Sequence, residues 1–124
     1  MRNRNIAIVA ALALLAMATA FAADVTGTWT ASFETQVGTQ NYTYTFKVEG
    51  GKLTGTAKSN LSETASAITN GTVSGDDISF TENLNYQGMQ FQIPYKGKIS
   101  GDEIKFTRTV VEGTPEDLVA KRVK

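Results

Sequence analysis

The most informative chemical groups in this chain are one acidic and one basic side chain at equivalent positions of an internal repeat. Residues 71–81 and 97–107 are identical at seven of eleven positions with an offset of 26, and Glu82 and Arg108 directly follow the two copies. In each copy, Ile and Phe alternate with polar residues and direct the next side chain to the same inward face. We therefore expect Glu82 and Arg108 to face inward with opposite charges.

Two interpretations of this pair stay open. A buried charge is costly unless it is paired, so the favoured interpretation is a structural Glu82–Arg108 bridge. The other is an anchor for a ligand headgroup, because a guanidinium suits a carboxylate. Aromatic side chains on the inward faces would surround either arrangement, although most of them must also fill the core. The candidate ligand-binding residues are Trp29, Phe33, Tyr42, Tyr44, Glu82, Phe91, Tyr95 and Arg108.

The composition removes the familiar catalytic schemes. The chain has no His and no Cys, so nucleophilic triads lack their usual base and the usual zinc sites lack their ligands. The acidic residues Asp76, Asp77, Asp102 and Glu103 lie in Ser-Gly-Asp turns, where Asp bonds local backbone donors, and we expect no metal there. Glycoside hydrolysis needs two facing carboxyl groups, and the alternation places only Glu82 inward. We expect no cofactor and no enzymatic activity; a carbohydrate-active accessory role is a minor alternative.

The elements that must position these residues are β-strands. Beyond residue 24, residues such as Val, Phe and Tyr alternate with Thr and Ser at a period of two, which is typical of strands with one buried face. Turns rich in Gly and Asp separate these runs. We predict eight strands, at residues 25–34, 40–49, 52–59, 67–74, 77–86, 89–99, 103–110 and 117–123.

The short connections predict that strands adjacent in sequence pair as antiparallel neighbours. Repeated hairpins leave exposed sheet edges unless the sheet closes, and eight strands are enough to close a small barrel. The interior of such a barrel holds side chains or one small ligand. We therefore predict an all-β, eight-stranded antiparallel up-and-down meander closed into a small barrel, with a two-sheet β-sandwich as the alternative.

The start of the first predicted strand, Gly27-Thr28-Trp29, resembles the Gly-x-Trp signature of the calycins, which include lipocalins and avidins. The run at residues 53–56, Leu-Thr-Gly-Thr, is similar to an avidin hairpin. The resemblance implies a calycin-like barrel in which Trp29 packs near a basic residue of the last strand, here Arg122. Avidin-type biotin contacts do not carry over, since Trp29 is the only Trp. Residues 23–124 also resemble small exported bacterial β-barrel proteins of unknown function; this resemblance supports the fold and does not indicate an activity.

The first 22 residues have the parts of a Sec-type secretory signal peptide. Arg2 and Arg4 precede an apolar run, and the small residues Ala20 and Ala22 follow it. We predict cleavage after Ala22, a periplasmic or secreted location, and one β-barrel domain over residues 23–124. An uncleaved anchor is disfavoured, because the apolar run is short and rich in Ala.

The charge balance limits the classes of partner that the chain can bind. The chain has 12 basic and 12 acidic residues; removal of Arg2 and Arg4 with the signal leaves ten basic residues and a net charge of −2. Nucleic-acid binding needs a concentrated positive surface, which is absent, so we exclude it. We also expect no stable membrane insertion after signal cleavage.

The leading functional hypothesis is a non-enzymatic extracytoplasmic barrel that binds a small, mostly apolar ligand with a polar or acidic end. The alternative is a structural or protein-interaction module with a solid core. The two differ in the interior: a connected cavity of about 300 Å³ or more at Tyr42, Tyr44 and Arg108 favours the ligand. A filled interior favours the interaction module.

Overall fold

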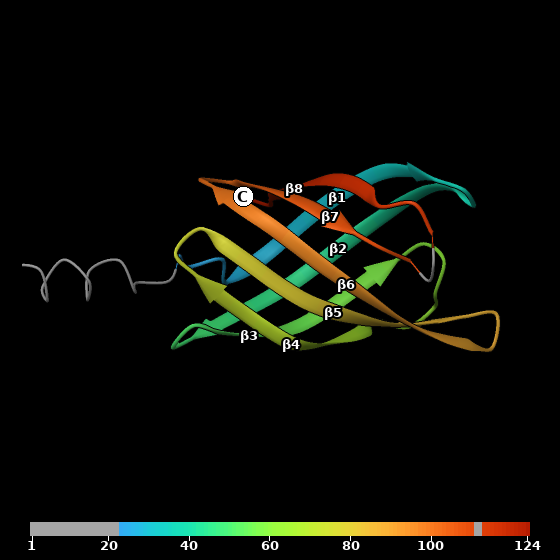
Figure 1. The fold of residues 1–124 in the computed structure, drawn as a ribbon, viewed down its shortest axis with the longest axis horizontal. Coiled ribbons are helices and arrows are strands. Elements are labelled where there is room, and N and C mark those ends of the chain that lie inside the picture. The colour runs from blue at the N-terminus through green and yellow to red at the C-terminus, as the bar shows by residue number, and fades with distance from the viewer. Residues whose placement is uncertain (1–22, 111–112) are drawn as a thin grey trace, which may run out of the picture.

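The computed structural model describes residues 23–110 and 113–124 and contains eight β-strands (Figure 1). Their bounds are β1 Gly27–Thr35, β2 Gly38–Glu49, β3 Lys52–Ser59, β4 Ser66–Ser74, β5 Asp77–Tyr86, β6 Met89–Ser100, β7 Glu103–Arg108 and β8 Glu116–Arg122. The predicted signal peptide at residues 1–22 lies outside the described residues, so its cleavage stays a prediction. No helix within the described residues is long and apolar enough to cross a membrane.

The strands form a closed barrel in which each strand is antiparallel to its chain neighbours and β8 pairs with β1. This confirms the predicted meander and rules out the two-sheet sandwich. The predicted strand bounds differ from the observed ones by at most two residues. The largest differences are at β1, which begins at Gly27, at β2, which begins at Gly38, and at β7, which ends at Arg108.

The period-two alternation of the sequence separates side chains that face the barrel interior from side chains that face outward. Along β2, Tyr42, Tyr44 and Phe46 are buried while the Thr residues between them are exposed. The inward aromatic rings pack against one another along the barrel axis, and the rings of Phe80 and Tyr95 stack with centroids 4.4 Å apart. This aromatic column is the core of the domain.

Close packing explains why both copies of the repeat begin with glycine. A Cβ atom at Gly97 would lie 2.6 Å from the ring of Phe106 on the neighbouring strand. A Cβ atom at Gly71, its counterpart in the first copy, would lie 2.3 Å from the carbonyl oxygen of Leu53. Only glycine allows these close approaches.

The barrel has two different ends (Figure 1). One holds the β2–β3, β4–β5 and β6–β7 turns, and we call it the Trp29 end. There the Trp29 indole N–H donates to the Val25 carbonyl oxygen at 2.9 Å, and the Arg122 guanidinium lies 4.5 Å from the Trp29 ring centroid. The predicted proximity of these two side chains is thus confirmed. The opposite end holds the β1–β2 and β5–β6 turns, and we call it the Arg108 end.

Candidate functional site

A buried polar cluster lies inside the barrel toward the Arg108 end. Its members come from five strands: Gln40, Tyr42 and Tyr44 from β2, Glu82 from β5, Tyr95 from β6, Arg108 from β7 and Glu116 from β8. Regular alternation brings the β2, β5, β6 and β7 members inward, since each is separated by one residue from another buried side chain. Glu82 is 0% exposed and Arg108 is 1% exposed.

Glu82 is held by two tyrosine hydroxyls. Tyr42 Oη donates to Glu82 Oε2 and Tyr95 Oη donates to Glu82 Oε1, each at 2.8 Å. The Tyr44 hydroxyl lies 3.0 Å from the Tyr95 hydroxyl and extends the network. The distance between Arg108 Nη1 and Glu82 Oε1 is 3.6 Å. The predicted inward charge pair therefore forms, with tyrosines bridging between the charges.

Arg108 directs all three of its nitrogens to side chains. Nη1 donates to the hydroxyls of Tyr42 at 3.0 Å and Tyr95 at 2.9 Å. Nη2 donates to Gln40 Oε1 at 3.1 Å, and Nε donates to Glu116 Oε1 at 2.8 Å. Four of the five guanidinium donors are thus engaged within the protein.

Aromatic faces complete the environment of the guanidinium. Its central carbon lies 4.8 Å from the ring centroid of Phe33 and 5.1 Å from that of Tyr42. Within the described residues, every buried side-chain nitrogen and oxygen has a hydrogen-bond partner. A satisfied network of this kind stabilises one packing of the core and leaves few free donors for a ligand.

Burial sets the protonation behaviour of the cluster. Loss of solvation is the largest cause that raises the pKa of Glu82, and it outweighs the hydrogen bonds from Tyr95 and Tyr42 and the charge of Arg108. Burial, with the nearby Glu82 charge, also raises the pKa of Tyr42 to about 12. The tyrosines therefore remain neutral hydrogen-bond donors at physiological pH.

The structure brings together most of the predicted site residues, but it separates two of them. Arg108 contacts Phe33, Tyr42, Glu82 and Tyr95, and the Tyr44 hydroxyl adjoins that of Tyr95. Trp29 instead lies at the opposite end of the barrel with Arg122. Phe91 is only partly buried and lines a pocket at the Arg108 end.

Two members of the cluster were missed by sequence reasoning. Gln40 precedes Tyr42 by one alternation, so the parity of β2 places it inward, and this signal was available in the sequence. Glu116 begins β8, one alternation before Leu118. The predicted eighth strand began at residue 117, and that one-residue difference left Glu116 out.

The acidic turns hold no metal-binding group. No group of three or more His, Cys, Asp or Glu side chains in the described residues has a metal-binding arrangement. Asp77 instead pairs with Lys98 at 2.5 Å, and Asp102 pairs with Arg122 at 3.0 Å and Lys124 at 2.7 Å. These turn acids therefore bind neighbouring cations of the same barrel end.

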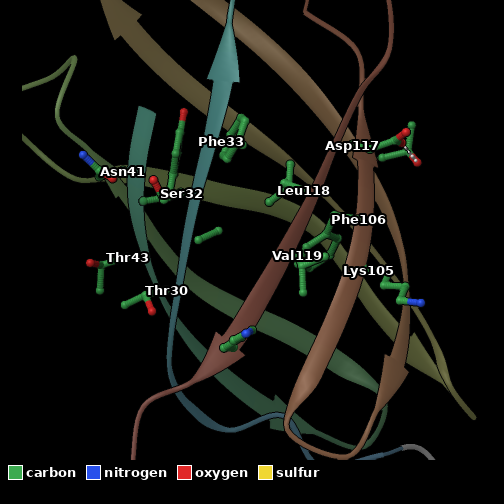
Figure 2. Close-up of a pocket in the computed structure, with 14 residues that line it drawn as sticks. Thr30, Ser32, Phe33, Asn41, Thr43, Lys105, Phe106, Asp117, Leu118 and Val119 are labelled. Atoms are coloured by element: carbon green, nitrogen blue, oxygen red, sulfur yellow. Dashed lines mark hydrogen bonds between the residues drawn. The ribbon is translucent and has the colours of Figure 1, made fainter. Parts of the chain in front are cut away.

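The largest pocket described in the barrel wall lies where β1 and β8 separate. The two strands pair only at Trp29↔Arg122 and Thr30↔Lys121, and they diverge toward the Arg108 end (Figure 2). We call the opening the seam pocket. Its volume is about 980 Å³. Its lining residues are Thr30, Ala31, Ser32, Phe33, Asn41, Tyr42, Thr43, Lys105, Phe106, Thr107, Asp117, Leu118, Val119 and Lys121.

The seam pocket has an apolar floor and a polar rim. Phe33 and Leu118 lie between the two diverging strands in Figure 2. The rim carries exposed Thr, Ser and Lys side chains of the outer face, together with Asp117, which accepts a hydrogen bond from Thr107 Oγ1 at 2.9 Å. No sequence pattern predicted this pocket.

A smaller pocket of about 230 Å³ opens at the Arg108 end; we call it the mouth pocket. Val37, Phe91 and Val110 give it an apolar wall, and Gln40 and Glu116 contribute polar groups. Since Gln40 and Glu116 both bond Arg108, the mouth pocket adjoins the buried polar cluster.

Comparisons with protein-family models, curated proteins and solved structures found no match to this chain.

Proposed function

We propose that this chain is an extracytoplasmic, non-enzymatic interaction module with a solid core, and that it binds its partner at the seam pocket. The observation that carries the proposal is the internal use of Arg108. Four of its donors are engaged by Tyr42, Tyr95, Gln40 and Glu116, so the best anchor for an acidic ligand inside the barrel is already occupied. The seam pocket, in contrast, is open to solvent and wide.

The proposal that the chain is not an enzyme rests on the environment of Glu82. It is the inward carboxylate of β5, it is 0% exposed, and two hydroxyls occupy its oxygens. A general acid or base must reach the proton it transfers within hydrogen-bonding distance of substrate. Glu82 does not meet this requirement in the closed barrel, which supports binding over catalysis.

Export and calycin-like ancestry belong to the same proposal. The predicted signal peptide supports a periplasmic or secreted location. The Gly27-Thr28-Trp29 start of β1 and the stacking of Arg122 on Trp29 support a calycin-like relationship. Neither feature identifies a partner.

A second candidate is the binding of a small, mostly apolar acid at the mouth pocket. The Glu116 carboxylate is 19% exposed and lies 2.8 Å from Arg108 Nε, so an incoming carboxylate could take its place. The volume of about 230 Å³ is below the roughly 300–1,000 Å³ of typical ligand pockets. The geometry therefore ranks this candidate second.

Site-specific crosslinking tests the proposal. A photoreactive amino acid replaces Thr43 at the seam pocket, or Gln92 on the exposed face of β6 as a control, in the full chain expressed in its own organism. We expect a discrete crosslinked macromolecule from position 43 and none from position 92. Absence of any adduct at position 43 would overturn the proposal.

Native mass spectrometry separates the second candidate from the first. A stoichiometric small molecule that co-purifies with the protein, and is lost in Arg108→Lys, would establish ligand binding in the barrel. A bare mass for the purified protein, together with the position-43 adduct, supports the interaction module.

A further inference from the structure

Two hydrogen bonds at the Trp29 end show which backbone N–H and C=O groups of β1 and β8 point into the seam. Val123 N–H donates to the Thr28 carbonyl oxygen at 2.8 Å, so these two residues direct backbone groups across the seam. Arg122 N–H donates to the Asp102 carbonyl oxygen at 2.9 Å, so the backbone N–H of Arg122 points away from the seam. In an antiparallel strand, successive residues direct their N–H and C=O groups to opposite neighbours.

This alternation continues along both strands, since neither the β1–β2 nor the β7–β8 register is shifted. Ser32 and Glu34 of β1 therefore direct their backbone groups toward β8, and Val119 and Asp117 of β8 direct theirs toward β1. Pairing between β1 and β8 ends at Thr30↔Lys121, so within the described residues these four have no partner across the seam. Two free strand edges thus face the same pocket.

The side chains around these edges define what would complement them. The floor formed with Phe33 and Leu118 is apolar. On the outer face Val119 is 39% exposed, and Lys105 lies directly opposite it on β7. Lys105 and Lys121 make no salt bridge with any described residue. The rim therefore offers two lysines, and one aspartate that already accepts a hydrogen bond from Thr107, around an exposed apolar side chain.

We propose that the seam pocket binds a single extended segment of a partner protein by strand addition. This inference rests on the proposed function and names its partner class. The segment alternates apolar side chains, which face Phe33 and Leu118, with acidic side chains, which face Lys105 and Lys121. Its backbone pairs with the free edges of β1 and β8, as in other strand-addition complexes.

A single segment fits this opening better than a second copy of the barrel. Each strand of the described barrel is bonded to neighbours along most of its length, so a second copy would present a sheet rather than one free strand. The seam is bounded on both sides, by β1 and by β8, and neighbouring strands require about 4.8 Å on each side. One extended segment brings a single strand to the seam, whereas a second copy brings its whole sheet.

Synthetic peptides test strand addition directly. The probe is a seven-residue capped peptide in which Val alternates with Asp, and its binding to the full chain is measured by fluorescence anisotropy. The matched control carries N-methyl groups on the backbone at alternate positions, which removes donors from one edge and keeps every side chain. We expect N-methylation to weaken binding by at least about tenfold, because several backbone hydrogen bonds are lost. A second control replaces Asp with Lys and should bind still more weakly.

Protein variants locate the interaction. Val119→Pro removes an N–H that faces the seam and leaves the β7 pairing intact, so the barrel should keep its circular dichroism spectrum while peptide binding falls at least about tenfold. Lys105→Glu with Lys121→Glu should also weaken binding, whereas Lys96→Glu on β6 should not. Hydrogen exchange should show peptide-dependent protection at Ser32, Glu34, Asp117 or Val119.

The outcomes separate this inference from the proposed function. Equal binding of the N-methylated peptide, or no binding of any peptide while the position-43 crosslink forms, would overturn strand addition and leave the interaction module standing. A dimer of the unliganded protein with protected seam amides would assign the edges to a second copy and also overturn it. Loss of the crosslink itself would overturn both.

Discussion

The two ends of the barrel each place an arginine against an aromatic ring, but with different consequences. Arg122 lies over Trp29, is 25% exposed, and donates to the backbone carbonyl oxygens of Asp24 and Thr26. Arg108 lies over Phe33, is 1% exposed, and donates only to side chains. Arg122 therefore joins the end of β8 to the segment that precedes β1, whereas Arg108 joins side chains of β2, β6 and β8 inside the barrel. Next to Arg122 the strands β1 and β8 are paired, and toward Arg108 they diverge.

The largest effect should come from leaving one charge of the Arg108 end unpaired. Arg108→Met removes the only arginine beside the buried Glu82, and we expect a loss of about 3–5 kcal/mol in the free energy of unfolding, measured with urea. The double variant Glu82→Leu, Arg108→Met removes both charges and should be more stable than the single variant. Additive losses in the double variant would contradict the coupling.

A smaller loss is expected at the Trp29 end. Arg122→Ala removes a cation–π contact and backbone hydrogen bonds at a partly exposed site, so the loss should be about 1–2 kcal/mol. Because Trp29 is the only Trp, its fluorescence reports the same change and should shift to longer wavelength. An unchanged Val123 amide exchange rate would show that Arg122 does not hold the seam closed.

The pH dependence of stability should distinguish the ends further. Burial raises the pKa of Glu82, so the folded state holds this proton more tightly than the unfolded state. The resulting stabilisation is full below the unfolded pKa, near 4.5, and is lost as the pH rises toward the folded pKa. Urea unfolding should show this decline in the wild type but not in Glu82→Gln. A parallel decline in both proteins would assign it to other groups.

The smallest effect should be at Asp102, and its sign should be opposite. Hydrogen bonds from Lys124 and Arg122 lower the pKa of Asp102 below its usual 3.8. The contribution is therefore present at neutral pH and is lost as the pH falls through the folded pKa. The stability difference between wild type and Asp102→Asn should be small at pH 7 and should vanish in acid. A difference that grows in acid would reverse this assignment.

Much of the fold and part of the site followed from alternation alone. Period two placed Tyr42, Glu82 and Arg108 inward, and the repeat predicted that two of them carry opposite charges at matching positions. Trp29 also has inward parity, yet it lies at the opposite end of the barrel from the cluster, and Phe91 lines the mouth pocket beside the cluster. Parity assigns a side chain to a face of the sheet, but it does not say how far along the barrel axis that side chain lies.

The seam pocket could not be predicted in this way. β1 and β8 are at opposite ends of the chain, so no local turn sets how many of their residues pair. The divergence after Thr30↔Lys121 depends on how all eight strands close. The residues on its rim, such as Lys105 and Val119, have the sequence pattern of ordinary outer-face positions.

The bridge between Glu82 and Arg108 also has a consequence for how the chain finds its structure. The two residues lie on β5 and β7, with β6 and its Tyr95 between them. A slip of one residue in either hairpin would turn one charge to the outer face and leave the other buried without its partner. The pair therefore penalises misaligned hairpins during folding, which matters most for a sequence whose two similar repeats could otherwise exchange partners.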